Sequence, residues 1–221
     1  MIKTIAKITT DFDSKFGIPR QPGLIPAARG RIVFEPEFRN PDTVRGLEAF
    51  SHLWLIWGFS ENVRDDWSAT VRPPRLGGNK RLGVFATRSP FRPNPLGLSV
   101  VELLSVEPDT PEGPVITVAG VDMLNGTPIY DIKPYVAYTD AVSEAESGFA
   151  PEAPARKDVR ADAALLGKLP EEKQEALLQV LALDPRPSYH DDPQRVYGFP
   201  YAGREVKFRV EGETVVLLEI E

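Results

Sequence analysis

Cysteine is absent from this chain of 221 residues, so disulfide bonds and cysteine-ligated metal sites are excluded. Only two histidines are present, His52 and His190, and their separation argues against a His-rich zinc site or a Ser-His-Asp triad. Long apolar runs are also missing: the longest covers residues 53–59, whereas a membrane-spanning helix needs about twenty residues. The N-terminus carries no apolar secretory signal. We therefore expect a cytoplasmic protein with no membrane segment and no metal.

Acidic residues are missing from one long window, residues 67–101, although the whole chain is acidic with 26 Lys+Arg against 32 Asp+Glu. The six cations of this window leave 20 basic against 32 acidic residues elsewhere, a net of −12. They are Arg72, Arg75, Lys80, Arg81, Arg88 and Arg92. Nine glycines and prolines lie between Pro73 and Gly97, where they open and stiffen the backbone. The window, which we call the basic arm, therefore favours binding of an anion such as a nucleotide or nucleic acid.

The first two thirds of the chain predict mainly β structure. Short β-branched or apolar runs alternate with Gly/Pro turns, which is typical of a small barrel or sandwich. The expected strands are residues 3–12, 31–34, 52–59, 82–87, 98–106, 115–121 and 129–133. The run 52–59 is apolar on both faces, so we expect it to be buried on both sides. One helix is expected at residues 43–50, capped by Asp42.

The last third predicts a separate small α+β domain at residues 158–221, after a β-barrel domain at 1–139. Residues 140–157 are rich in Ala, Glu, Ser and Pro and are expected to form a linker. Two helices are predicted, at residues 159–167 and 171–183, followed by a hairpin of residues 205–210 and 214–220.

Candidate binding residues occur in loops. The segment GIPRQPGL, residues 17–24, is either a rigid turn with an exposed tip or a ligand-facing corner that presents Arg20 and Gln21. In the basic arm, ATRSPFRPNP places Arg88 and Arg92 among prolines that cannot donate hydrogen bonds. The alternative is a proline-stiffened surface loop with scattered charge, but the complete lack of acids favours pairing with phosphate or carboxylate.

A further candidate segment is DMLNGTPIYDIKPY, residues 122–135. Asp122 and Asn125 can contact hydroxyls or amines of a ligand at a hairpin turn. The following strand puts Asp131, Lys133 and Tyr135 on one face. Asp131 and Lys133 can equally form an exposed salt bridge, which contributes only about 0–1 kcal/mol.

These segments, in this order, resemble the TrmO-type tRNA methyltransferases, also called the YaeB or VirR family. The resemblance rests on PRQPGL, VRGLEAFSHLW, VRPPRLGGNKRLGVFATRSPFRPNPLGLS, DMLNGTPIYDIKPY and DPRPSY, and it covers residues 1–138 and 184–189. It implies a small antiparallel β-barrel that binds S-adenosylmethionine and works as a homodimer. It also implies methylation of N6 of threonylcarbamoyladenosine at position 37 of tRNA, beside the anticodon.

The resemblance also implies which residues form the sites. The residues expected to bind the cofactor are Arg20, Gln21, Pro22, Gly23, Ser60, Glu61, Arg88, Asp122, Met123, Leu124 and Asn125. Arg186 and Tyr189 belong to DPRPSY, which the resemblance implies helps to hold tRNA; from their chemistry we also expect Arg72, Arg75 and Tyr135 to bind the substrate.

The reaction requires removal of a proton from a weakly acidic, urea-like nitrogen. We expect Asp131 to act as the base, with Lys133 or Arg92 stabilising the ureido oxygen; Glu61 and Tyr135 are alternatives for the base. Arg72, Arg75 or Arg92 can bind the threonyl carboxylate. The competing interpretation is a non-catalytic β-barrel that binds RNA or nucleotides, which would not need a methyl-donor pocket. A phosphate-ester hydrolase ranks last, because no metal-ligand cluster is evident in the sequence.

Overall fold

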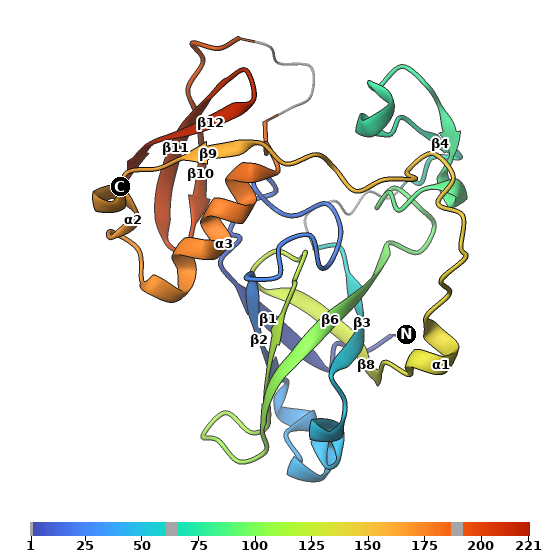
Figure 1. Cartoon of the computed structure of the whole chain (residues 1–221). Coiled ribbons are helices and arrows are strands. Elements are labelled where there is room, and N and C mark those ends of the chain that lie inside the picture. Colours follow the sequence, from blue (N-terminus) through green and yellow to red (C-terminus); the bar gives the residue numbers. More distant parts are fainter. Residues whose placement is uncertain (1, 61–65, 187–191) are drawn as a thin grey trace.

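The computed structural model describes residues 2–60, 66–186 and 192–221. Six strands close into a barrel in the order β1-β2-β7-β6-β3-β8, and each neighbouring pair is antiparallel (Figure 1). The strands are β1 (Ala6–Thr10), β2 (Arg29–Phe34), β3 (His52–Gly58), β6 (Leu96–Glu107), β7 (Val115–Ala119) and β8 (Thr127–Pro134). The prediction of a small antiparallel barrel is confirmed.

Alternation of side chains along the strands builds the barrel core. In β3, Leu53, Leu55 and Trp57 are buried inside the barrel, while Trp54 and Ile56 on the outer face are only partly buried. The expectation that residues 52–59 are buried on both faces is therefore wrong for the single chain. The chain covers the outer face of β3 only in part.

The basic arm ends in the first residues of β6, and its part before that strand, residues 67–95, is an excursion between β3 and β6 that stands apart from the barrel (Figure 1). It holds a two-stranded ribbon, β4 (Thr70–Val71) and β5 (Leu82–Gly83), and the 3-10 turns Pro74–Leu76 and Val84–Ala86. The strand predicted for residues 82–87 is wrong beyond Gly83. The chain turns there instead, and the Thr87 amide donates to the Val84 carbonyl at 3.1 Å.

The helix predicted for residues 43–50 is also wrong. The chain forms three 3-10 turns in this region: Pro36–Phe38, Pro41–Val44 and Leu47–Ala49. Gly46 lies between the last two turns and has a left-handed φ of 86°, which an α-helix cannot contain. The residue that caps the second turn is Asn40, whose side chain accepts a hydrogen bond from the Asp42 amide.

The C-terminal unit is a four-stranded sheet with two helices, which confirms the predicted α+β character. Its strand order is β10-β11-β12-β9. The elements are β9 (Asp158–Arg160), α2 (Ala163–Leu166), α3 (Glu171–Ala182), β10 (Tyr197–Tyr201), β11 (Arg204–Glu211) and β12 (Thr214–Ile220). The helix predicted for residues 159–167 is half wrong: its first residues form β9, parallel to β12, and α2 begins only after the cap Asp162.

The segment between the two units follows the short helix α1 (Ala137–Asp140) and runs past the basic arm to β9 (Figure 1). It is held at several points. Trp54 donates to the Asp140 carboxylate at 3.0 Å, Arg75 of the arm donates to the Glu152 carbonyl, and Arg156 donates to the Leu24 carbonyl at 2.7 Å. The predicted linker thus contacts both the arm and the loop that precedes β2.

Aromatic packing joins the C-terminal unit to the barrel. Phe12 pairs with Tyr201 as a β-bridge, and the Phe16 ring lies 5.9 Å from that of Phe199. An ion pair of 2.7 Å between Lys173 of α3 and Asp11 borders this cluster. The loop of residues 13–25 therefore leaves the barrel against a rigid wall. Among the described residues, none of the helices has the length and apolar character that crossing a membrane requires.

Candidate active site

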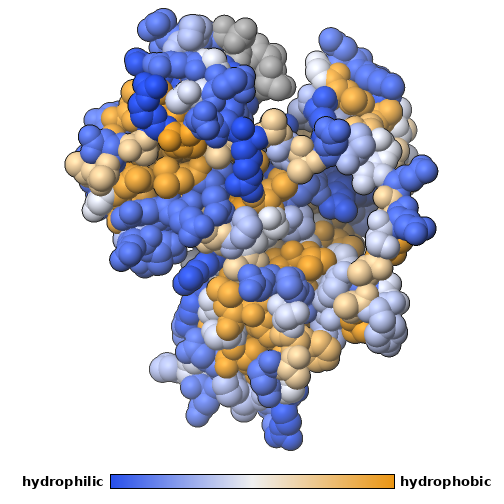
Figure 2. Space-filling view, in the orientation of Figure 1, coloured by the Kyte–Doolittle hydropathy of each residue, from blue (hydrophilic) through white to orange (hydrophobic). Residues whose placement is uncertain are grey.

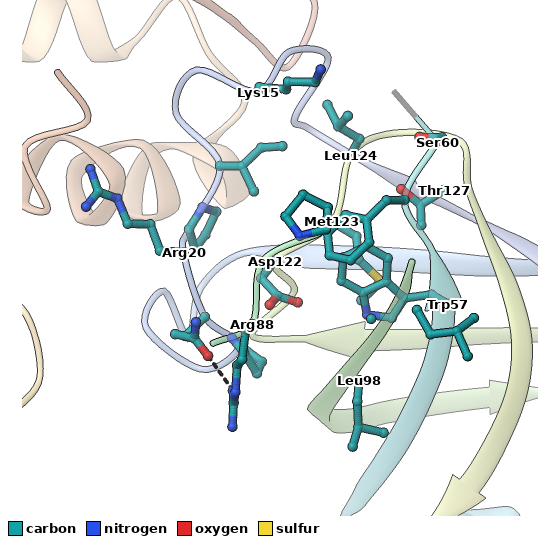
Figure 3. A pocket seen from close by; sticks show the side chains of 18 of the residues that line it. Lys15, Arg20, Trp57, Ser60, Arg88, Leu98, Asp122, Met123, Leu124 and Thr127 are labelled. Carbon is teal, nitrogen blue, oxygen red and sulfur yellow. Dashed lines mark hydrogen bonds between the residues drawn. The ribbon is translucent and has the colours of Figure 1, made fainter. Parts of the chain in front are cut away.

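A cavity of about 690 Å³ opens where four segments meet at one end of the barrel (Figure 3). This volume lies within the range of about 300–1,000 Å³ that is usual for small-molecule sites. The segments are the loop of residues 15–22, the end of β3, the basic arm, and the turn that follows β7. The lining residues are Lys15, Ile18, Pro19, Arg20, Gln21, Pro22, Trp54, Trp57, Phe59, Ser60, Arg88, Pro90, Arg92, Leu96, Gly97, Leu98, Val100, Asp122, Met123, Leu124 and Thr127.

The loop of residues 17–24 is placed by two glycines at its ends. Gly17 has a φ of 95° and lies so close to the Phe199 ring that an added Cβ would stand 2.7 Å from it. Gly23 also has a positive φ, and its amide donates to the Gly120 carbonyl at 2.9 Å. Both ends are thus fixed, and Gln21 and Pro22 between them face the cavity.

Arg88 connects the basic arm to this loop. Its guanidinium donates to the side-chain oxygen of Gln21, the contact drawn as a dashed line in Figure 3. The backbone around Arg88 is held by Thr87, whose hydroxyl donates to the Val84 carbonyl at 2.8 Å and accepts from the Ser89 amide at 3.3 Å. The arm therefore closes one side of the cavity.

Asp122 is the carboxyl group within the cavity, and Figure 3 shows it between Arg88 and Met123. Burial raises the pKa of Asp122 to about 6, because desolvation penalises the charged form. A hydrogen bond of 2.7 Å from Ser99, its own backbone amide and the positive charge of Arg88 oppose that rise. This group therefore changes its charge just below neutral pH, and a cation or hydrogen-bond donor on a ligand favours its ionised form.

The floor of the cavity is apolar. The rings of Trp57 and Phe59 lie 4.5 Å apart, and Met123 is fully buried beside Leu124. Apolar and aromatic walls with a few polar groups are typical of sites for planar heterocycles such as adenine.

Arg20 borders this cavity and also a second one. Figure 3 shows its guanidinium pointing away from Asp122. The second cavity, about 470 Å³, lies between the loop, the end of α3 and the linker, and Arg186 also lines it. Arg186 donates to Asp184 there at 3.0 Å. Arg20 and Arg186, one of the residues predicted to bind tRNA, thus line the same cavity.

Most of the predicted cofactor residues line the first cavity. These are Arg20, Gln21, Pro22, Ser60, Arg88, Asp122, Met123 and Leu124. Gly23 and Asn125 do not line the cavity. The Asn125 amide group donates to Asp13 at 3.0 Å and accepts from the Thr10 amide at 3.3 Å, so it ties the turn to β1. Glu61 lies outside the described residues.

The predicted catalytic and substrate residues are less concentrated. Arg92 lines the cavity. Asp131 and Lys133 form an ion pair of 3.0 Å on β8, next to β3, where Lys133 stands opposite the cavity residue Trp54. Tyr135 also packs on Trp54, at 5.8 Å between ring centres. Neither Asp131 nor Lys133 lines the cavity, and their assigned roles remain predictions.

The remaining substrate candidates lie farther out. Arg72 is exposed on the arm, and Arg75 is bound to the linker. Tyr189 falls outside the described residues.

Sequence reasoning missed Lys15, Trp57 and Thr127 as lining residues. Trp57 and Thr127 look like ordinary strand residues, and only barrel closure places them at this end. A weak signal was available in Gly97. An added Cβ on Gly97 would lie 2.1 Å from the Trp57 indole, so the glycine makes room for that ring.

The geometry defines a class of protein: a closed β-barrel with a ligand pocket that combines a buried carboxyl group, arginines and an aromatic floor. Two family models match the chain. The tRNA-methyltransferase O N-terminal domain matches residues 7–141, and the TrmO C-terminal domain matches residues 154–221. The chain belongs to the TrmO family.

Relatives and solved structures agree with this assignment. The chain is 39% identical to the tRNA (adenine(37)-N6)-methyltransferase of Escherichia coli over 93% of this chain and 91% of that protein. It is 46% identical to the protein of the same name from Eikenella corrodens over 74% of this chain and 92% of that protein. The crystal structure of TrmO from Pseudomonas aeruginosa superposes with a TM-score of 0.83 at 33% identity, covering 100% of this chain and 97% of that one.

Proposed function

We propose that this chain transfers the methyl group of S-adenosylmethionine to N6 of adenosine 37 in tRNA, and that the substrate base carries a threonylcarbamoyl group. The observation that carries the proposal is that Gln21, Arg88 and Asp122 line one and the same cavity. The chain is also 39% identical to the E. coli enzyme. A non-catalytic RNA-binding barrel would not require this cavity.

The residues present fit the cofactor. Its adenine suits the apolar floor of Trp57, Phe59 and Met123. Its hydroxyl and amino groups are hydrogen-bond donors, for which Asp122 supplies an acceptor, and Gln21 and Arg88 offer polar contacts to its remaining groups. When bound, the cofactor supplies an activated methyl group on a sulfonium centre.

The chain's own contribution is mainly alignment and exclusion of water. Holding two reactants in a productive geometry can contribute about 7–11 kcal/mol to lowering a barrier. The Arg88–Gln21 hydrogen bond closes the cavity where it meets the basic arm. The aromatic rings of Trp57 and Phe59 limit the access of water at its floor. A base is still needed for the N6 proton, and Asp131 remains our candidate, with Lys133 or Arg92 beside the ureido oxygen. Asp131 lies on β8 opposite Ile56 of β3, two residues along the strand from the cavity residue Trp54.

The threonyl carboxylate requires a cation. Arg92 is the best-placed candidate because it lines the cavity, and its guanidinium lies 6.0 Å from the centre of the exposed Phe85 ring. Arg72 and Arg75 stand farther out on the arm and suit phosphates of the anticodon loop. Arg20 and Arg186 in the second cavity extend the positive surface toward the C-terminal unit.

We infer a cytoplasmic homodimer. Figure 2 shows hydrophobic residues gathered over the barrel face that carries β6 and β3. Leu98 and Leu104 of β6 are large apolar side chains that are exposed there. A second copy on this face would bury Leu98 and Leu104, and Leu98 also lines the cavity.

The test is transfer of labelled methyl groups from S-adenosylmethionine to two tRNA preparations, one with and one without the threonylcarbamoyl group. We expect incorporation at N6 of adenosine 37 only in the modified tRNA. Equal incorporation into both would reject the threonylcarbamoyl requirement, and no incorporation into either would reject the methyltransferase assignment. An Asp131→Asn variant with near-normal turnover would reject Asp131 as the base.

A further inference from the structure

A chain of hydrogen bonds runs through the barrel wall behind Asp122. The indole N–H of Trp57 on β3 donates to the Ser99 hydroxyl on β6 at 3.0 Å. The Ser99 hydroxyl donates to Oδ1 of Asp122 at 2.7 Å. Ser99 is completely buried and Trp57 is 7% exposed, so water does not compete for these contacts.

The direction of these two hydrogen bonds is fixed by the chemistry of the groups. An indole N–H can only donate, so the Ser99 oxygen must accept from Trp57. The single hydroxyl hydrogen of Ser99 is then directed to Asp122. Gly97 permits the arrangement, because any larger residue there would collide with the indole. Side chains of two strands, β3 and β6, thus hold one carboxyl oxygen of the turn that follows β7.

The second oxygen of Asp122 is differently placed. Within residues 2–60, 66–186 and 192–221, no side chain other than Ser99 donates a hydrogen bond to this carboxyl group. Asp122 lines the cavity together with Met123 and Leu124. Ser99 holds one oxygen in the wall, and among the described residues no other side chain donates to the carboxyl group on its cavity side.

We propose that Ser99 and Trp57 are positioning residues, which hold Asp122 so that its second oxygen accepts a hydrogen bond or faces a positive charge of the methyl donor. The proposal rests on the proposed function for the identity of the donor. Ser99 also stabilises the ionised carboxylate, since its hydrogen bond lowers the Asp122 pKa against the effect of burial. Loss of Ser99 would leave the carboxyl group both free to rotate and harder to ionise.

Other charges act on the same carboxyl group and must be considered. Arg88 lowers the Asp122 pKa through its positive charge. Lys15, Arg20 and Arg92 line the same cavity from the loop and the arm. The hydrogen bonds of the Ser99 hydroxyl are to Trp57 and Asp122, not to any of these four cations. A change in the pH profile on replacing Ser99 therefore reports on Asp122.

The experiment measures the affinity of S-adenosylmethionine by titration calorimetry between pH 5.5 and 8.5 for wild type, Ser99→Ala, Trp57→Phe and Asp122→Asn. Wild-type affinity should rise with pH through about 6. If Ser99→Ala makes the carboxyl a tenfold weaker acid, affinity at pH 6 falls about fivefold further than at pH 8.5. Trp57→Phe should move the profile in the same direction by less, and Asp122→Asn should remove it. Ser105→Ala, an exposed serine on the same strand, is the matched control and should leave the profile unchanged.

A second readout does not depend on the cofactor. Carbon-13 NMR of the Asp122 carboxyl in the free protein should show a higher titration midpoint in Ser99→Ala than in wild type. Equal midpoints, or a loss of affinity that is uniform across pH, would overturn the positioning role. If wild type binds no S-adenosylmethionine, the proposed function and the donor contact both fail. The NMR titration then decides whether Ser99 controls Asp122.

Discussion

The guanidinium of Arg88 donates a hydrogen bond to the side-chain oxygen of Gln21, across 67 positions of sequence. This contact joins the basic arm to the loop of residues 17–24 at the edge of the cavity. Both segments were predicted from the sequence to bind the same ligand, and their contact is the direct structural basis for treating them as one site.

The position of that loop depends on Gly17. Gly17→Ala would place a methyl group against the Phe199 ring and strain a backbone with φ of 95°. We expect a loss of about 2 kcal/mol or more in the free energy of unfolding, together with weaker cofactor binding. Gly46→Ala is the control: its φ of 86° carries the same backbone cost, but nothing lies within 4 Å of the added Cβ. Equal losses in urea unfolding for the two variants would show that packing on Phe199 does not hold the loop.

The stability of the free protein should depend on the protonation of Asp122. Its pKa in the folded chain, about 6, lies above the ordinary value of 3.8. The folded state therefore binds this proton more tightly, so the contribution to stability is complete below pH 3.8 and is lost as pH rises through about 6. Relative to Asp122→Asn, wild type should lose up to about 3 kcal/mol across this window in urea unfolding. If the stabilities of the two proteins changed with pH in parallel, the raised pKa of Asp122 would be contradicted.

Binding of tRNA should weaken as salt increases. The body of the chain is acidic, so the basic arm must supply most phosphate contacts. Replacing Arg72 and Arg75 together with alanine should reduce the slope of log affinity against log salt by about 1.4, the value for two contacts with single-stranded RNA. Affinity measured by filter binding that is flat from low to high salt would exclude the arm as the RNA surface.

Self-association should depend on the outer face of β6. Leu104 is 41% exposed there, and a charge at this position would be buried by a second copy. Leu104→Glu should weaken the dimer at least about tenfold in sedimentation equilibrium. Val196→Glu, at a 53% exposed residue of the C-terminal unit, should leave the dimer intact. Wild type that sediments as a single chain at all concentrations would refute the dimer.

The sequence was sufficient for much of the fold because strand alternation and turn residues are local signals. Prediction from the sequence failed where contacts with other parts of the chain, or single residues within a segment, outweighed the local pattern. Residues 84–86 have strand-like composition but form a 3-10 turn, and β10 was missed because Gly198 and Pro200 interrupt its apolar residues. The edge strand β9 exists only because β12 pairs with it.

The same holds for the site. Gln21, Arg88 and Asp122 could be predicted because they lie in loops that glycine, proline and charge mark in the sequence itself. The Trp57–Ser99 bond could not be predicted, because it depends on the register in which β3 and β6 pair when the barrel closes. For the same reason the sequence could not distinguish Asn125, which is used in the wall, from Asp122, which faces the cavity.

The central claim is that the basic arm and the loop of residues 17–24 together form the methyl-donor pocket. Calorimetric titration of S-adenosylmethionine into wild type, Arg88→Ala and Arg81→Ala tests it most directly. Arg81 lies on the same arm, but its side chain bonds Thr70 and does not line the cavity. We predict one site per chain in wild type, affinity about tenfold weaker in Arg88→Ala, and affinity within about twofold of wild type in Arg81→Ala. Equal affinity for all three proteins, or no binding to wild type, would contradict the account.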